Sequence, residues 1–294
     1  WGKWTRYTLD KNNALKEPDV YVMGTATTIL GLAIQNANRA SSGWTLGQID
    51  DTEEIQWTYS AAKLLTVIQD VADRTNLKFW FDGKELNLTR RQPDTGIEFE
   101  FGKGKELYEL SRTRRDKPIV THMTVVGGSQ NIPSGYGFRN IQPTGGNPMI
   151  NPNYGSGMDI VEDVIVFENV YPRLHAAVTA LASGTNTIRS TDIDFDLNDH
   201  RLADGTFPQI AFTSGLLNGF KFDIGEDGYI HSNRQIIFNP IQDDNAYPQG
   251  VPNALQKPAI GDTFVFLNIS MPASYVTAAE NRVEELGDQY FAEE

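Results

Sequence analysis

Two stretches in the first third of the chain carry apolar residues at helical spacing. Over residues 25–43 these are Ile29, Leu30, Ala33, Ile34 and Ala37. Over residues 60–76 they are Ala61, Leu64, Leu65, Ile68, Val71 and Ala72. Because residues three and four apart share one face of a helix, both stretches predict amphipathic helices.

The residues that flank these stretches predict where the helices begin and end. Thr27 or Thr28 is suited to cap the start of the first helix, and Ser42-Gly43 to end it. Ser60 is suited to the N-cap of the second helix, and Asn76 to the left-handed position after its last turn.

Strand patterns lie on either side of the two helices. The sequence VYVMG at 20–24 predicts a short strand. LKFWFDGKELNL at 77–88 predicts a hairpin, since Asp82-Gly83 suits a two-residue turn with positive φ. The side of its first strand that faces the second helix is expected to carry Leu77, Phe79 and Phe81.

Beyond about residue 90 short strand patterns alternate with turn-rich loops. Strands are predicted over 119–128, 159–171, 192–197, 220–225, 234–240 and 262–270. Two stretches rich in Gly, Pro and Asn, 129–157 and 243–258, predict long loops or arms. We therefore predict an α+β fold, mainly β, in three parts: an N-terminal α+β domain at 1–93, a β segment with a long arm at 94–158, and a β-rich domain at 159–294 that ends in a helix.

The last helix is predicted over 274–291. Its apolar positions step by three and four residues, like positions a and d of a heptad: Val276, Ala279, Val283, Leu286 and Tyr290. Either the helix packs this stripe on its own domain, or the five side chains form an oligomer interface; about two heptads do not decide between the two. Gly287 inside the stripe weakens the helix by roughly 1 kcal/mol.

The composition narrows the classes of function. The net charge is −13, whereas nucleic-acid binders usually carry a basic surface; the densest basic stretch, 103–117, is expected to be solvated. The chain has no cysteine, which excludes disulfides, cysteine nucleophiles and zinc–thiolate sites. No apolar run approaches the roughly 20 residues of a membrane-spanning helix. Since the chain opens with WGKW and no initiator Met, we expect a fragment or a processed chain.

Residues 192–200, DIDFDLNDH, are the segment that most resembles a site of chemistry. On a strand the three aspartates would share one face and the apolar residues the other. A helix–loop–helix calcium site fails, because its sixth and twelfth positions need Gly and Glu and here hold Leu197 and Ala203. Calcium bound near Asp192–Asp199 in another geometry and catalysis by paired carboxylates stay open. The simplest prediction is a polar strand face followed by a turn.

The sequence also contains few of the residue motifs that indicate other kinds of catalysis. The chain holds four histidines, none of them paired as HxH or HExxH: His122, His175, His200 and His231. No GxSxG turn, phosphate-binding loop or dinucleotide-binding glycine motif occurs. We therefore predict no enzyme activity, no catalytic residue, no metal and no cofactor.

The order of several segments resembles a family of phage tail proteins. The first part of the series is SSGWTLGQID (41–50), TEEIQWTYS (52–60), the helix SAAKLLTVIQDVA (60–72) and the hairpin FWFDGKELNL (79–88). The later part is FENVYPR (167–173), DIDFDLND (192–199), IAFTSGLLNGFKF (210–222) and KPAIGDTFVFLNISMPASYVTAAE (257–280). Over most of the chain this series is similar to prophage tail proteins of the tail-tip or baseplate hub type.

The resemblance implies a homotrimeric hub in the virion tail, with a ring of β-barrel-like domains and a smaller α+β domain attached. Such a hub joins the tail tube, or a distal tail protein, to tip or fibre proteins and serves host attachment. DNA passes through it without specific binding. Many relatives continue into a lysin or a receptor-binding part, and nothing in this chain matches a lysin's catalytic residues.

The sequence leaves two alternative functions open. A carbohydrate-binding or receptor-binding module would use aromatic side chains for stacking, although large aromatics more often pack in cores; the candidates are Trp44, Trp57, Trp80, Tyr136 and Tyr154. A hydrolase would use the acidic segment at 192–199.

Overall fold

The computed structural model describes residues 20–38, 42–60, 62–90, 100–102, 119–154, 159–243 and 247–293, together with 8–9, 15–16, 98 and 109. These residues form three α-helices and twenty short strands in several small sheets, none of which closes into a barrel. The predicted α+β fold, mainly β, is confirmed. Except for Glu109, the basic stretch 103–117 lies outside the described residues.

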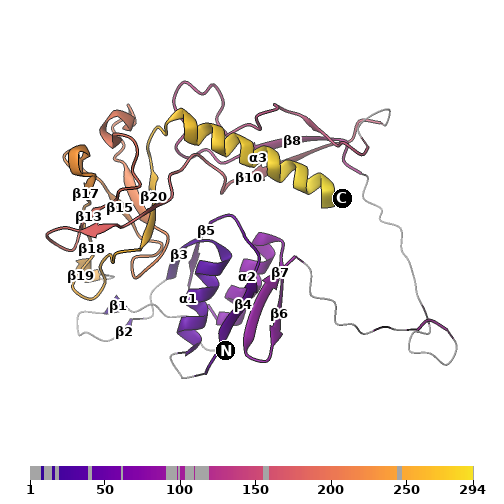
Figure 1. Ribbon diagram of the computed structural model, residues 1–294, viewed down its shortest axis with the longest axis horizontal. Coiled ribbons are helices and arrows are strands. Elements are labelled where there is room, and N and C mark those ends of the chain that lie inside the picture. Colours follow the sequence, from indigo (N-terminus) through magenta and orange to yellow (C-terminus); the bar gives the residue numbers. More distant parts are fainter. Residues whose placement is uncertain are drawn as a thin grey trace.

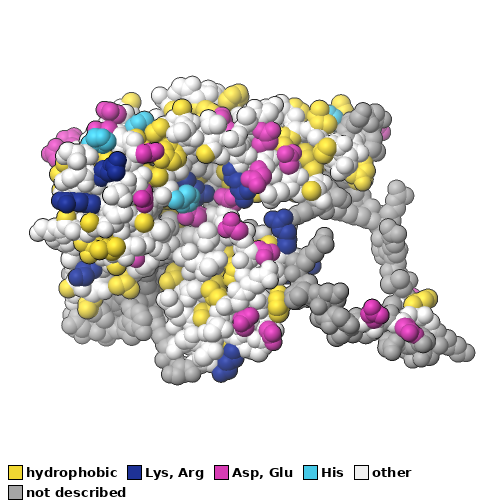
Figure 2. Space-filling view, in the orientation of Figure 1, with side chains coloured by type: hydrophobic (Ala, Val, Ile, Leu, Met, Phe, Trp, Pro, Cys, Tyr) yellow, Lys and Arg dark blue, Asp and Glu magenta, His cyan; other side chains and the backbone are white. Residues whose placement is uncertain are grey.

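The described residues form three larger hydrophobic cores and a smaller fourth one made of Met23, Tyr171, Ala211, Val265 and Leu267. In Figure 1 the N-terminal α+β body lies at the bottom, a β-rich body lies at the left, and the last helix crosses two strands at the upper right. Acidic side chains are spread over the visible face rather than gathered in one patch (Figure 2). This distribution accords with the net charge of −13.

The N-terminal body packs two helices on two small sheets. Its elements are β3 (Val20–Gly24), α1 (Ala26–Asn38), β4 (Thr45–Ile49), β5 (Ile55–Tyr59), α2 (Leu64–Thr75), β6 (Lys78–Asp82) and β7 (Glu85–Thr89). β3 pairs with β5 antiparallel, and β7 lies between β4 and β6. Ahead of it, β1 (Thr8–Leu9) pairs with β2 (Leu15–Lys16). The core contains the apolar faces of both helices and Leu77, with Phe79 at its margin, whereas Phe81 is exposed.

The ends of α1 differ from the prediction at one side. The helix begins one residue before Thr27, so Thr27 and Thr28 lie inside it and neither caps its start. Its first N–H donates instead to Oγ1 of Thr52 at 2.9 Å, a side chain distant in sequence. At the other end the helix stops at Asn38, before the predicted Ser42-Gly43, and Ser42 Oγ donates to the carbonyl oxygen of Ala37 in its last turn at 2.9 Å.

The ends of α2 show the same contrast. Ser60 is not its N-cap, because the helix begins at Leu64 and the extended residue Lys63 (ψ 144°) occupies the cap position without a side-chain hydrogen bond. Asn76 takes the left-handed conformation at the C-cap (φ 53°), as predicted. Its backbone N–H donates to the carbonyl oxygens of the last turn.

The hairpin at 77–88 forms with its turn moved by one residue. Asp82 pairs with Glu85, so the loop residues are Gly83 and Lys84 rather than Asp82-Gly83. Gly83 has φ 56°, a value that favours glycine.

The second body combines strands from the middle of the chain with its last helix. Its elements are β8 (His122–Gly127), β9 (Met149–Ile150), β10 (Glu162–Phe167) and α3 (Ala273–Glu293). β8 lies between β10, which is parallel to it, and β9, which is antiparallel. The predicted domain boundary after 158 therefore falls between two strands that lie side by side.

Helix α3 approaches this sheet closely. A Cβ on Gly287 would lie 2.6 Å from Sδ of Met149 and 3.2 Å from a methyl of Val125. Gly287 thus costs helix propensity but leaves room for the strands beneath. The predicted arm at 129–157, where it is described, docks on the same helix, since Tyr136 donates to Glu280 at 2.9 Å.

The third body is inserted in sequence between β10 and α3. Its strands are β11 (Ala176–Ala177), β12 (Ala180–Leu181), β13 (Thr187–Arg189), β14 (Gln209–Phe212), β15 (Lys221–Asp223), β16 (Tyr229–Ile230), β17 (Gln235–Ile237), β18 (Ile241–Asp243), β19 (Tyr247–Val251) and β20 (Thr263–Leu267). The two larger sheets have the orders β11-β20-β14-β15 and β12-β13-β17-β16 and share one phenylalanine-rich core. The predicted loop 243–258 contains β19, which pairs with β18.

Candidate functional site

The acidic segment at 192–200 is not a strand, so that prediction was wrong. Its last part is a 3-10 helix, Leu197–His200, and the residues before it form a turn. The alternation of side chains does hold, because Ile193, Phe195 and Leu197 all enter the core of the third body. Every second side chain is buried here because the segment runs along the surface of the core, although it pairs with no described strand.

The three aspartates of this segment each bind a different element. Asp192 accepts the N–H of Ala177 at 2.8 Å. Asp194 accepts the hydroxyl of Tyr275 at 2.7 Å, and burial, followed by this hydrogen bond, raises the pKa of Tyr275. Asp196 caps the 3-10 helix by accepting an N–H within it. Across the described residues no group of three or more acidic or histidine side chains is arranged to hold a metal ion. The three aspartates therefore stabilise the fold through these hydrogen bonds.

The histidines are equally dispersed. Each has a partner in a different part of the fold: His122 with Thr121, His175 with Glu54, His200 with the carbonyl of Ser270, and His231 with Tyr229. His200 and His231 both lie beside the acidic segment, where the ring of His200 packs on Phe195 at 5.1 Å and Nδ1 of His231 lies 4.0 Å from Oδ2 of Asp196.

Charged residues join the N-terminal body to the other two. Arg173, which follows β10, donates to Oε2 of Glu54 at 2.8 Å and lies 3.4 Å from Glu53. Arg282 on α3 donates to Oε1 of Glu53 at 2.6 Å. The Arg173 and Glu54 side chains are only 8% and 9% exposed. Burial alone raises the pKa of Glu54, but the hydrogen bond with His175 and the charge of Arg173 outweigh it, so the pKa lies below its usual value.

A second junction links β3 to the hairpin between β14 and β15. Asn218 is fully buried; its Oδ1 accepts the N–H of Met23 at 3.1 Å and its Nδ2 donates to the carbonyl of Met23 at 2.6 Å. Gly219 has φ 78°, and a Cβ there would lie 2.4 Å from the carbonyl oxygen of Tyr21. The Asn-Gly turn therefore lies directly on the backbone of β3.

The apolar stripe of α3 packs on its own chain. Val276, Ala279 and Val283 are buried against β8 and the adjoining loop, and Leu286 and Tyr290 lie at the margin of the same core. This is the packing expected for a helix lying on its own domain. An oligomer interface at these five residues stays a prediction, and it would require the helix to leave β8.

The opposite face of the same sheet is open. Ile165 and Phe167 of β10 point into the core under α3, so the alternating residues point away from it. Val164 is 64% exposed, Val166 47% and Ile150 of β9 59%. β10 is also one of the two outer strands of the sheet, β9 being the other. The same face also carries Glu162, His122 and Thr124. A mixed face with exposed apolar residues beside an outer strand is a surface suited to a protein neighbour.

The five candidate aromatics do not form one platform. Trp44 and Trp80 are partly buried in the N-terminal body, where the Trp80 Nε1–H donates to Thr89 at 3.1 Å. Tyr136 is tied to α3. Trp57 and Tyr154 are exposed, at 43% and 37%.

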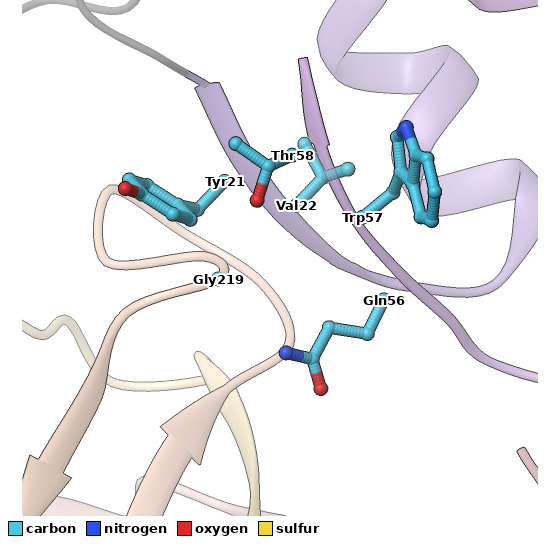
Figure 3. Close-up of a pocket in the computed structure, with 6 residues that line it drawn as sticks. All are labelled: Tyr21, Val22, Gln56, Trp57, Thr58 and Gly219. Atoms are coloured by element: carbon cyan, nitrogen blue, oxygen red, sulfur yellow. The ribbon is translucent and has the colours of Figure 1, made fainter.

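One of these two lies beside a pocket. The pocket has a volume of about 310 Å³ and is lined by Tyr21, Val22, Gln56, Trp57, Thr58 and Gly219. In Figure 3 Gln56 and Thr58 project from β5 on the side of Tyr21 and the Gly219 turn, whereas the ring of Trp57 points away from them toward a helix, where the guanidinium of Arg74 in α2 lies 3.5 Å from its centroid.

Comparison with family models, with curated proteins and with solved structures finds no match for the chain. Among the described residues no helix is both long enough and apolar enough to cross a bilayer.

Proposed function

We propose that the protein is a structural component of a bacteriophage or prophage tail tip or baseplate, where three copies form a hub ring. The ring would connect the tail tube to tip or fibre proteins. The order of segments that resembles such hubs is one support. In this proposal the two facing sheets of the third body take the place of the β-barrel-like ring domain.

The observation that carries the proposal is the open face of the β10-β8-β9 sheet. Val164, Val166 and Ile150 expose apolar surface beside an outer strand, which costs free energy unless a neighbour covers it. A second copy of the chain is the neighbour that a ring supplies. The charged and Asn218 junctions support the same function, because a connector must keep its parts fixed under load.

The net negative charge of the chain also agrees with this function. With a net charge of −13, the protein repels polyanions on average. DNA would therefore pass through the ring without being held.

Negative-stain images of the purified chain and of two variants test the proposal. Val164→Asp places a charge on the open face, whereas Leu255→Asp places one on an exposed loop (66%) of the third body. We expect rings from the wild type and from Leu255→Asp, and single particles from Val164→Asp. Single particles from the wild type would contradict the hub. Rings that survive Val164→Asp would move the contact to another surface.

A further inference from the structure

Strand β5 has an open outer edge, since within the described part of the chain it pairs with β3 alone. The side chain of Asn218 takes both backbone groups of Met23 in β3, so those groups point away from β5. Met23 lies opposite Gln56, and Tyr21 lies opposite Thr58. In an antiparallel pair, opposite residues point their backbone groups either toward each other or both away. The N–H and C=O of Gln56 and of Thr58 therefore point outward.

Strand β10 has an open outer edge as well, because β8 lies on its other side. His122 of β8 lies opposite Glu162 and donates its N–H to the carbonyl oxygen of Val161 at 3.1 Å. In a parallel pair a residue bonds to the neighbours of the residue opposite it, so the backbone groups of Glu162, and of every second residue after it, point outward. Val164 is one of these, and its N–H donates to the exposed carboxylate of Asp163 at 2.8 Å, a contact that a partner strand can replace.

The side chains give the two edges matching orientations. On β5 the two residues with outward backbone groups have their side chains on one face, whereas Trp57 points to the other face, where Arg74 of α2 covers its ring (Figure 3). On β10 the outward residues Val164 and Val166 lie on the open face, whereas Ile165 faces the core under α3. In both strands the residues with outward backbone groups thus carry side chains opposite the helices. Two such edges can join into one sheet with all its helices on one side.

We propose that β5 of one copy pairs antiparallel with β10 of the next copy, and that this pairing is a contact of the ring. The inference rests on the proposed hub function. A closed ring needs two different surfaces on every copy, one for each neighbour, and the two open edges supply them. Thr58 then lies opposite Val164, and Gln56 opposite Val166, with backbone hydrogen bonds within each pair. This register sets outward groups against outward groups and brings both exposed valines of β10 beside the neighbour.

Disulfide cross-linking tests the pairing on the whole chain, which contains no cysteine of its own. Hydrogen-bonded opposite residues have Cα atoms about 5.5 Å apart, a distance that a disulfide spans. The double variant Thr58→Cys/Val164→Cys carries one cysteine on each edge, so mild oxidation should convert most of the sample to covalent trimers on a denaturing gel. Leu255→Cys/Val164→Cys, with one cysteine on an exposed loop of the third body, is the matched control and should remain as single chains.

Gln56→Cys/Val166→Cys is a second pair in the same register and decides the outcome if the first pair disturbs the fold, which thermal unfolding checks. Light scattering on the reduced samples separates the strand pairing from the hub function. A trimeric mass with no cross-link from either pair overturns the pairing and leaves the hub function standing. Equal cross-linking in the control also overturns the pairing. A protein that stays at the single-chain mass overturns both proposals.

Discussion

Asn218→Ala is expected to loosen the junction between the N-terminal body and the third body. The side chain is 0% exposed. It makes three hydrogen bonds to backbone groups, with the N–H and C=O of Met23 and the C=O of Thr213. Alanine leaves all three buried groups without that partner. Each such group costs roughly 1–3 kcal/mol. Because water and small backbone shifts offset part of this, we expect a total loss of about 3–5 kcal/mol.

Urea denaturation gives the free energy of unfolding, and hydrogen exchange at the Met23 amide reports the junction itself. The variant should unfold at lower urea concentration, and the Met23 amide should lose protection. Asn233→Ala, at an exposed position, is the matched control and should change stability by no more than about 0.5 kcal/mol. A loss below about 1 kcal/mol in Asn218→Ala, with the Met23 amide as protected as in the wild type, would refute the reasoning.

Three further predictions concern single contacts. The pKa of Glu54 lies below its usual 4.5 in the folded chain, so its ion pairs stabilise the fold above that pH and the stabilisation is lost as the pH falls through the folded pKa. Arg173→Met should therefore cost roughly 3–5 kcal/mol near neutral pH. The cost should fall as the pH is lowered from 4.5 through the folded pKa of Glu54, as measured by urea denaturation along a pH series, and a cost that stays the same through acid unfolding would contradict the ion-pair account. Gly219→Ala should lower stability by more than about 1 kcal/mol, because of its positive φ and its approach to Tyr21; an unchanged melting temperature would show that the turn can shift. Asp194→Ala should cost about 1 kcal/mol through its lost hydrogen bond, and calcium should leave the wild-type melting temperature unchanged; a calcium-induced rise that Asp194→Ala abolishes would restore the metal-site hypothesis.

Local patterns were enough to predict the three helices and eight of the twenty strands in the described part of the chain. The left-handed Asn76 depends on a few neighbouring residues and is confirmed. Of the predicted stripe, four residues are buried, Leu64, Ile68, Val71 and Ala72, whereas Val67 is buried in place of Leu65 and Ala61 lies outside the described residues. Caps were less predictable, since α1 begins on the hydroxyl of Thr52, which comes from another loop. The alternation of the segment at 192–197 reported burial correctly but not strand pairing. Strand pairing depends on a neighbour that the pattern does not specify.

The junctions could not be predicted from spacing. Glu54 and Arg173 are distant in sequence and meet only because three bodies converge. The Asn-Gly dipeptide at 218–219 is a tight-turn signal, but nothing local shows that the Asn218 side chain binds the backbone of β3. Likewise Trp57 was one aromatic among five, and its network with Arg74 appears only when α2 packs beside β5.

The hub assignment is tested most directly by the mass of the whole chain in solution, measured by light scattering across a range of concentrations. The account predicts a mass three times the 32.8 kDa of the chain, with a fall toward the single-chain mass in Val164→Asp. A wild-type protein that stays at the single-chain mass at every concentration would contradict it.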